Sequence, residues 1–261
     1  MTADLGDRAE FMTKLVELAI RAGEEILEVY SEDFEVLSKA DESPVTAADE
    51  RAEAVILAGL AALAPAIPVV AEESVAAGKI PEVGDGPFFL VDPLDGTKQF
   101  VERNGQFTVN IALIEDRRPT LGVVHLPALG ETYWTDGRGG ACRRIGDGEV
   151  ESIGCRVPAA DGLVVMASRS HRNQETEDYL ATLPIKELDA SGSSLKFCRV
   201  AEGAADLYPR LGRTMEWDVA AGHAVLTAAG GSMTLMDGEP FMYAKPGFEN
   251  PHFLVRGLPA E

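Results

Sequence analysis

The sequence FFLVDPLDGT at residues 88–97 places two carboxylates and a hydroxyl at the end of a predicted strand. The short apolar run at residues 88–91 is typical of a buried strand. Pro93 cannot donate a ladder hydrogen bond, and Gly96 permits a sharp turn of the backbone. The strand is therefore expected to end in a crowded polar group made of Asp92, Asp95 and Thr97.

Two carboxylates this close favour a metal site, although other interpretations exist. Buried Asp and Glu are rare unless they are paired or bind a metal, and Mg²⁺ prefers carboxylate, carbonyl and water oxygens. The alternative is an acidic surface turn, because Asp, Pro and Gly all favour turns. A phosphatase with an aspartyl nucleophile also carries an Asp-Gly-Thr element, but its two acids stand two residues apart. Asp92 and Asp95 stand three apart.

The composition is that of a globular protein with a strong negative charge. The 261 residues suffice for one large domain or two small ones, with 46% hydrophobic and 25% charged residues. The 23 basic and 43 acidic residues give a net charge of −20. This balance argues against a nucleic-acid polymer or an anionic membrane as a partner held by charge alone. It allows a small phosphate substrate if bound cations reverse the local field.

The cysteines and the N-terminus predict a cytoplasmic location. Cys142, Cys155 and Cys198 lie far apart and form no C-x-x-C motif, as expected of core residues in a reducing compartment. Residues 1–10 are acidic and polar, unlike a signal peptide. The chain has no apolar run of the ~18 residues that a membrane-spanning helix needs.

The first half, residues 1–155, predicts two helices packed on a largely antiparallel sheet, an α+β arrangement. Apolar residues at helical spacing indicate helices at Arg8–Tyr30 and from Thr46 to about Leu63. A strand at Ile67–Val70 is expected to end in Glu72 and Glu73, followed by a loop over 74–86. The regular spacing of later strands indicates a β-meander at Phe107–Ile114, Thr120–Leu126, Glu131–Thr135 and Gly140–Arg144.

The second half, residues 156–261, alternates strands and helices and is predicted to be α/β. The expected helices are Asn173–Leu183, Leu195–Glu202 and Trp217–Ala229. The expected strands are Leu163–Ala167, Lys186–Asp189, Ala205–Leu211, Ser232–Met236 and His252–Val255.

Three further acids each have a structural and a functional interpretation. Asp49 caps a helix or orients a water beside Thr97. One of Glu72 and Glu73 faces Asp92, because adjacent residues of a strand point to opposite faces, or both are solvated. Asp218 stabilises the start of a helix electrostatically or is a metal ligand.

Two turns in the second half could bind an anion. Gly192-Ser193-Ser194 precedes a predicted helix and would offer free N–H groups and hydroxyls, or an ordinary Ser cap. Ser168-Arg169-Ser170-His171 follows a strand and would bind phosphate through Arg169 and the hydroxyls, or form a solvated loop. A general base at His171 is not needed if metals activate the water.

Together these motifs resemble the inositol-monophosphatase-like superfamily of lithium-sensitive, Mg²⁺-dependent phosphatases. The superfamily marks are EES at 72–74, DPLDGT at 92–97 and WDVAAG at 217–222. Further stretches resemble its CysQ branch, the 3′(2′),5′-bisphosphate nucleotidases of sulfur metabolism. They are SPVTAAD at 43–49, KQF at 98–100, NGQFTVNIAL at 104–113, SRSH at 168–171, GSSLKFC at 192–198 and LYPR at 207–210. Gln99 and Gln106 stand where branch members often have Glu.

The resemblance implies a layered α-β-α-β-α sandwich with the site between the halves. It implies that two or three Mg²⁺ ions are held by Glu72, Asp92, the Leu94 carbonyl, Asp95 and Asp218. Asp49 and Thr97 would orient the attacking water, with Glu72 also in the catalytic set. The substrate would meet Glu72, Leu94, Asp95, Gly96, Thr97 and Asp218. Its nucleotide part would meet Ser168, Arg169, Gly192, Ser193, Ser194 and Lys196.

The function expected from this resemblance is a phosphatase that hydrolyses adenosine 3′,5′-bisphosphate to AMP and phosphate. In-line attack by an activated water, with no covalent enzyme intermediate, is the expected step. An inositol or sugar phosphatase of the same fold is the alternative, and a catalytically idle Mg²⁺- or nucleotide-binding regulator is an alternative of another class. Branch relatives are sometimes placed at the inner membrane face, so a peripheral membrane association belongs to the same expectation.

Overall fold

A computed structural model describes residues 2–31, 36–38, 44–168 and 173–259 of the chain. The backbone alone is described for the short hairpin β1 (Val36–Ser38) and β2 (Pro44–Thr46). Of the predicted site residues, Arg169 lies outside the described part, as does His171. Within the described part, no helix combines the length and the apolar character needed to cross a membrane.

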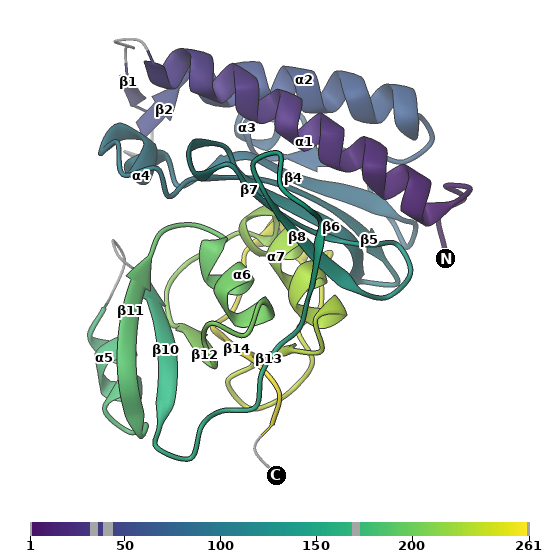
Figure 1. The fold of residues 1–261 in the computed structure, drawn as a ribbon. Helices are drawn as coiled ribbons and strands as arrows, with labels where there is room; N and C mark the ends of the chain where they lie inside the picture. The colour runs from purple at the N-terminus through teal and green to yellow at the C-terminus, as the bar shows by residue number, and fades with distance from the viewer. Residues whose placement is uncertain (1, 32–35, 39–43, 169–172, 260–261) are drawn as a thin grey trace.

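The fold consists of alternating helical and sheet layers (Figure 1). Helices α1 (Arg8–Ser31) and α2 (Ala47–Leu63) lie over one face of a first sheet. Helices α6 (Leu195–Ala201) and α7 (Glu216–Ala228) lie between this sheet and a second one. Helix α5 (Gln174–Leu180) lies on the outer side of the second sheet. The predicted α-β-α-β-α sandwich is therefore confirmed.

The described residues form a first sheet of seven strands in the order β3-β4-β5-β6-β7-β8-β9. Strands β3 and β4 are parallel, and every later neighbour is antiparallel, which confirms the predicted meander. The strands are β3 (Val69–Ala71), β4 (Phe88–Asp95), β5 (Thr108–Glu115), β6 (Arg118–Leu126), β7 (Glu131–Thr135), β8 (Ala141–Ile145) and β9 (Glu151–Ile153).

The described part of the second half forms a five-stranded sheet in the order β11-β10-β12-β14-β13. Strand β10 runs parallel to both of its neighbours, whereas β14 is antiparallel to both of its own. The strands are β10 (Leu163–Ser168), β11 (Ile185–Ser191), β12 (Leu207–Arg210), β13 (Ser232–Leu235) and β14 (Phe253–Arg256). In sequence, the first sheet ends at Ile153 in β9, and the second begins at Leu163 in β10. Residue 155 falls between them, and the domain boundary there stays a prediction.

Strand β4 is apolar without alternation because both of its faces are buried. Phe89 and Val91 belong to the core shared with α1 and α2. Phe88 and Leu90 belong to the core shared with α6, α7 and the second sheet. Side chains alternate along a strand, so Asp92 continues the row of Phe88 and Leu90 on the α7 side.

Several local predictions were wrong. Glu72 and Glu73 do not end a strand, because β3 stops at Ala71 and both acids open the short helix α3 (Glu72–Ala76). The predicted loop over 74–86 therefore begins inside a helix. Pro93 does not end β4, which continues to Asp95, and the short helix α4 (Thr97–Val101) follows it.

Candidate active site

The parallel pairing of β3 and β4 brings the first two acids together. Ala71 lies opposite Val91 in the register, so the chain leaves both strands at the same edge. Glu72 follows Ala71 as the first residue of α3, and Asp92 follows Val91. Residues 20 apart in sequence thereby become neighbours.

A β-bulge between Asp92 and Asp95 of β4 sets the directions of these two side chains, which both line the cavity. Asp92 pairs with Asn110 and Asp95 with Thr108, so two residues of β4, Pro93 and Leu94, lie opposite a single residue of β5. A bulge of this kind re-aims side chains and tolerates proline, which has no N–H to donate. The Leu94 N–H turns back and donates to Oδ1 of Asp92 at 3.1 Å.

Gly96 makes the turn from β4 into α4. Its φ is +94°, in the left-handed region that glycine adopts without strain. Helix α4 begins directly afterwards at Thr97, so the Thr97 hydroxyl lies next to the end of β4. Gly96 and Thr97 both line the same cavity as Asp92 and Asp95.

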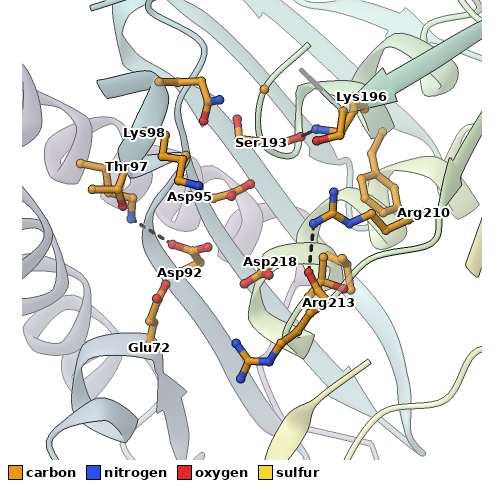
Figure 2. Close-up of a pocket in the computed structure, with 18 of the residues that line it drawn as sticks. Glu72, Asp92, Asp95, Thr97, Lys98, Ser193, Lys196, Arg210, Arg213 and Asp218 are labelled. Carbon is orange, nitrogen blue, oxygen red and sulfur yellow. Dashed lines mark hydrogen bonds between the residues drawn. The ribbon is translucent and has the colours of Figure 1, made fainter. Parts of the chain in front are cut away.

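Asp218 joins these acids from the other half of the chain. It lies in the first turn of α7, and its Oδ2 accepts the Met215 N–H at 2.8 Å. One carboxylate oxygen from each of Glu72, Asp92 and Asp218 lies within 4.8 Å of the other two. Figure 2 shows the three side chains converging from α3, β4 and α7.

The electrostatics of this cluster fit a bound cation. Burial raises the pKa of Asp92 well above its ordinary value of 3.8, and the charges of Glu72, Asp95, Asp218 and Asp49 raise it further. Burial, then Asp95 and Glu72, also raise the pKa of Asp218. Buried and half-buried carboxylates so close together repel one another unless a positive charge neutralises them. Carboxylate oxygens are the donors that hard divalent cations prefer.

The acids form one wall of a cavity of about 250 Å³. Positive charge comes from Lys196, Arg210 and Arg213 of the second half, and from Lys98 beside Thr97, which all line the cavity. Figure 2 shows Lys196 and Arg210 approaching from the second sheet and α6, across from Glu72 and Asp92. The cavity therefore offers a cation site and an anion site side by side.

Lys196 is buried in the first turn of α6. Its ammonium donates to the carbonyl oxygens of Ser191 at 3.3 Å and of Ser193, and it lies 5.2 Å from the ring centre of Tyr208. Burial lowers the pKa of Lys196 to about 7, although the Asp95 charge acts in the opposite direction. An anion bound beside it would raise this pKa and favour the charged form.

Arg210 also lines the cavity, although the sequence did not identify it as a site residue. It is 9% exposed, and its Nη2 donates to the Arg213 carbonyl at 2.9 Å. Its buried Nε has no hydrogen-bond partner among the described residues. The one signal in the sequence was the resemblance of LYPR at 207–210 to the CysQ branch, because the position of this strand end beside the cavity depends on tertiary packing.

The Gly192–Ser194 turn does not offer the free groups that were predicted. The Gly192 N–H donates to Oε1 of Gln106 at 3.0 Å, and the Ser193 hydroxyl donates to the Gln106 carbonyl at 3.0 Å. The Ser194 hydroxyl donates to the Asp218 carbonyl at 2.7 Å instead of capping α6. Protein acceptors thus occupy the turn, although Gly192 and Ser193 still line the cavity.

Most of the predicted site residues meet at this cavity. It is lined by Glu72, Asp92, Leu94, Asp95, Gly96, Thr97, Ser168, Gly192, Ser193, Lys196 and Asp218. Asp49 and Ser194 are buried and are not among the residues that line it. Asp49 is near enough to raise the pKa of Asp92, and the Ser194 N–H donates to Asp95, so both lie directly behind the lining. Their roles stay predictions.

The sequence model of the inositol monophosphatase family matches residues 7–255. The chain belongs to this family. Within the family, the 3′(2′),5′-bisphosphate nucleotidase CysQ of Shigella flexneri is 45% identical over 251 residues, which cover 94% of this chain and 98% of the relative. The same enzyme of Escherichia coli K12 is 44% identical over the same shares.

Solved structures of the inositol monophosphatase family share the fold. A crystal structure of CysQ from Bacteroides thetaiotaomicron superposes with a TM-score of 0.81 and 39% identity, covering 97% of this chain and 99% of the other. The inositol monophosphatase of Thermotoga maritima gives a TM-score of 0.77 and 25% identity, covering 94% and 91%.

Proposed function

We propose that this chain is a metal-dependent 3′(2′),5′-bisphosphate nucleotidase that converts adenosine 3′,5′-bisphosphate to AMP and phosphate. The proposal rests on one observation above all: a cavity in which a three-carboxylate cluster faces a wall of lysine and arginine side chains. The sequences of the nucleotidases of Shigella flexneri and Escherichia coli support it, because they are 45% and 44% identical to this chain along nearly their whole length.

The proposed cofactor is Mg²⁺, as two or three ions. Glu72, Asp92, Asp95, Asp218 and the Leu94 carbonyl would hold them, because these groups supply hard oxygen donors at one place. When bound, such cations would supply a nucleophile at neutral pH and neutralise charge on the phosphoryl group.

The residues around the end of β4 would position the reacting groups. Gly96 lines the cavity between Asp95 and Thr97, so its backbone would meet the scissile phosphate. The Thr97 hydroxyl would hydrogen-bond the attacking water, and the buried Asp49 would fix that hydroxyl from behind. Thr97 and Asp49 would thus orient the water. Orientation raises the reaction rate because it keeps the water in line with the bond that breaks.

The cationic wall would select a substrate with a second anionic group. The phosphate that is not cleaved would meet Lys196 and the guanidinium of Arg210, whose Nε has no hydrogen-bond partner among the described residues. Hydrogen bonds between charged groups are roughly twice as strong as neutral ones. A monophosphate lacking this second group would not form these charge-assisted contacts, which disfavours its binding.

A substrate panel tests the proposal. Purified protein with Mg²⁺ should release phosphate from adenosine 3′,5′-bisphosphate far faster than from inositol 1-phosphate, and Li⁺ should inhibit the reaction. Preferential hydrolysis of inositol 1-phosphate would overturn the nucleotidase assignment. Asp92→Asn and Asp95→Asn should abolish turnover, whereas Asp85→Asn, an exposed Asp outside the cavity, is the matched control. Equal background rates in the wild type and all three variants would indicate an idle binding protein.

A further inference from the structure

The two halves of the chain meet at a compact joint beside the cavity. The loop between α4 and β5 contributes Gln106, and the turn between β11 and α6 contributes Gly192 and Ser193. Gln106 accepts two hydrogen bonds from that turn, one at its side-chain Oε1 from the Gly192 N–H and one at its carbonyl from the Ser193 hydroxyl, both at 3.0 Å.

Gln106 is itself fixed to the catalytic side of the site. Its N–H donates to Oδ1 of Asn104 at 3.0 Å, and the Asn104 N–H donates to the Gln99 carbonyl in α4 at 3.2 Å. Helix α4 starts at Thr97, directly after Gly96. A continuous set of hydrogen bonds therefore connects the end of β4 to the turn of the other half.

The joint is packed too tightly for any side chain at its two glycines. A Cβ atom on Gly192 would lie 2.6 Å from Cγ of Gln99 and 2.7 Å from the Gln106 carbonyl oxygen. A Cβ atom on Gly96 would lie 3.2 Å from both the Gln106 carbonyl oxygen and Cβ of Ser193. The Gly192–Ser193 turn is thus packed closely against Gln106 and against the backbone at Gly96.

The Gly192–Ser193 turn, held in this position, binds the ammonium of Lys196. The Ser191 and Ser193 carbonyls both accept from Lys196 Nζ. Ser193 has a φ of +42°, an unusual conformation for a residue with a side chain, and its hydroxyl bond to Gln106 helps to maintain it. The Gln106 backbone carbonyl and its side chain therefore both fix the turn that holds Lys196, and the side-chain contact to Gly192 is the one that depends on the residue at position 106.

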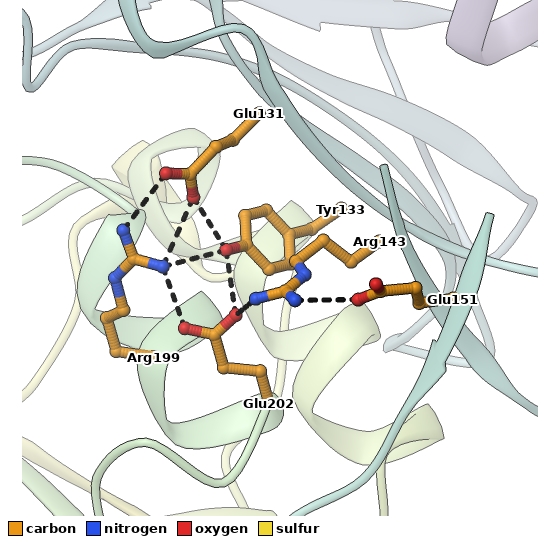
Figure 3. Close-up of polar contacts among 6 residues, drawn as sticks. All are labelled: Glu131, Tyr133, Arg143, Glu151, Arg199 and Glu202. Carbon is orange, nitrogen blue, oxygen red and sulfur yellow. Dashed lines mark hydrogen bonds and ion pairs between the residues drawn. The ribbon is translucent and has the colours of Figure 1, made fainter. Parts of the chain in front are cut away.

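The far end of α6 is anchored separately (Figure 3). Arg199 and Glu202 form ion pairs with Glu131 of β7 and Arg143 of β8, at 3.1 and 2.6 Å. The Tyr133 hydroxyl lies between them, 2.9 Å from Glu202 and 2.9 Å from Arg199. Loss of the Gln106 contact would therefore loosen the turn that precedes α6 without detaching the helix from the first sheet.

We propose that Gln106 is a positioning residue that sets the preference for bisphosphates over monophosphates. It does not itself line the cavity, and it acts through the Gly192–Ser193 turn on Lys196, which meets the second phosphate. The inference rests on the proposed function. A Glu at this position would keep the acceptor for the Gly192 N–H, so acceptor chemistry is what the joint requires.

The experiment compares Gln106→Met, which removes the acceptor at similar length, with Gln106→Glu, which keeps it. Gln174→Met, on the exposed surface of α5, is the matched control. We expect Gln106→Met to raise KM for adenosine 3′,5′-bisphosphate about three- to tenfold, the effect of one neutral hydrogen bond, with a smaller change in kcat. KM for 3′-AMP, which lacks the second phosphate, should change less than about twofold. Gln106→Glu should restore the wild-type value.

Binding without turnover supplies a second measurement. The product AMP keeps the second phosphate, so calorimetry should show weaker AMP binding to Gln106→Met and unchanged adenosine binding. Equal losses for the bisphosphate and 3′-AMP, or a Gln106→Glu variant as impaired as Gln106→Met, would overturn the inference. If Gln106→Met does not fold, Gln106→Asn takes its place. Its side chain is one methylene shorter, so its amide oxygen lies farther from the Gly192 N–H. A wild type that prefers 3′-AMP would instead refute the proposed function.

Discussion

Asp92→Asn should make the metal-free protein more stable while it destroys the site. Asp92 is 1% exposed, and its carboxylate lies within 4.8 Å of ligand oxygens of Glu72 and Asp218. Two unit charges at that separation repel by about 3 kcal/mol at an effective dielectric constant of 20. Proton uptake by the cluster relieves part of this repulsion. We therefore expect a gain of about 1–3 kcal/mol in unfolding free energy without metal, because Asn has the same shape and still accepts the Leu94 N–H.

Added Mg²⁺ should reverse this order. A ligand that binds the folded state alone stabilises it by about 2.7 kcal/mol at one hundred times its dissociation constant. The wild type has the full ligand set and should gain this amount, whereas the variant lacks one carboxylate and should gain less. The more stable protein in chelator should thus become the less stable one in excess Mg²⁺.

The pH dependence without metal follows from the same charges. Burial and the neighbouring carboxylates raise the pKa of Asp92 above 3.8, so the folded state keeps a proton that the unfolded chain has already released. Stability then falls as pH rises above that value, since the folded state binds more protons. Asp92→Asn should make this fall shallower.

Urea denaturation in chelator and in excess Mg²⁺, at several pH values, measures all three effects. Asp85→Asn removes an exposed carboxylate outside the cavity and should leave the order unchanged. A less stable Asp92→Asn in chelator, or equal stabilisation of variant and wild type by Mg²⁺, would refute the reasoning.

Three further changes probe other parts of the molecule. Gly122→Ala should lower the unfolding free energy by about 1–3 kcal/mol in urea denaturation, because its Cβ would lie 2.7 Å from the Ala221 carbonyl oxygen of α7. Burial lowers the pKa of His125 to about 4, so the unfolded chain gains a proton between pH 6.5 and 4 that the folded state refuses. The wild type should lose about 3 kcal/mol of stability over that range through His125, and His125→Gln should lose less. Arg210→Gln should raise KM for adenosine 3′,5′-bisphosphate about tenfold to a hundredfold in steady-state assays, the effect of losing a hydrogen bond between charged groups.

The layers and the acid cluster could be predicted from sequence because their signals are local. The helical spacing of the apolar residues predicts α1 and α2. The continuous apolar run of β4 predicts a buried strand, and both of its faces are indeed buried. The acids stand at or near element ends, where neighbouring strands and helices meet. The short helix α3 was missed because three residues of β3 carry too little alternation to mark where the strand stops.

The partners of polar groups could not be predicted in the same way. The Gly192–Ser194 sequence shows that donors exist, but their acceptors come from Gln106, 86 residues away, and from Asp218. Arg210 likewise ends a strand whose position beside the cavity depends on how the second sheet packs against the first. Contacts of this kind depend on tertiary packing, which leaves no periodic pattern in the chain.

The position of Asp218 has a consequence for how the protein matures. Its helix α7 packs against strands of the first sheet, yet it is encoded more than 60 residues after that sheet ends at Ile153. A chain still emerging from the ribosome has synthesised the whole meander before its third carboxylate exists. A cation that needs all three carboxylates would therefore bind only after the second half has been made and has docked on the first.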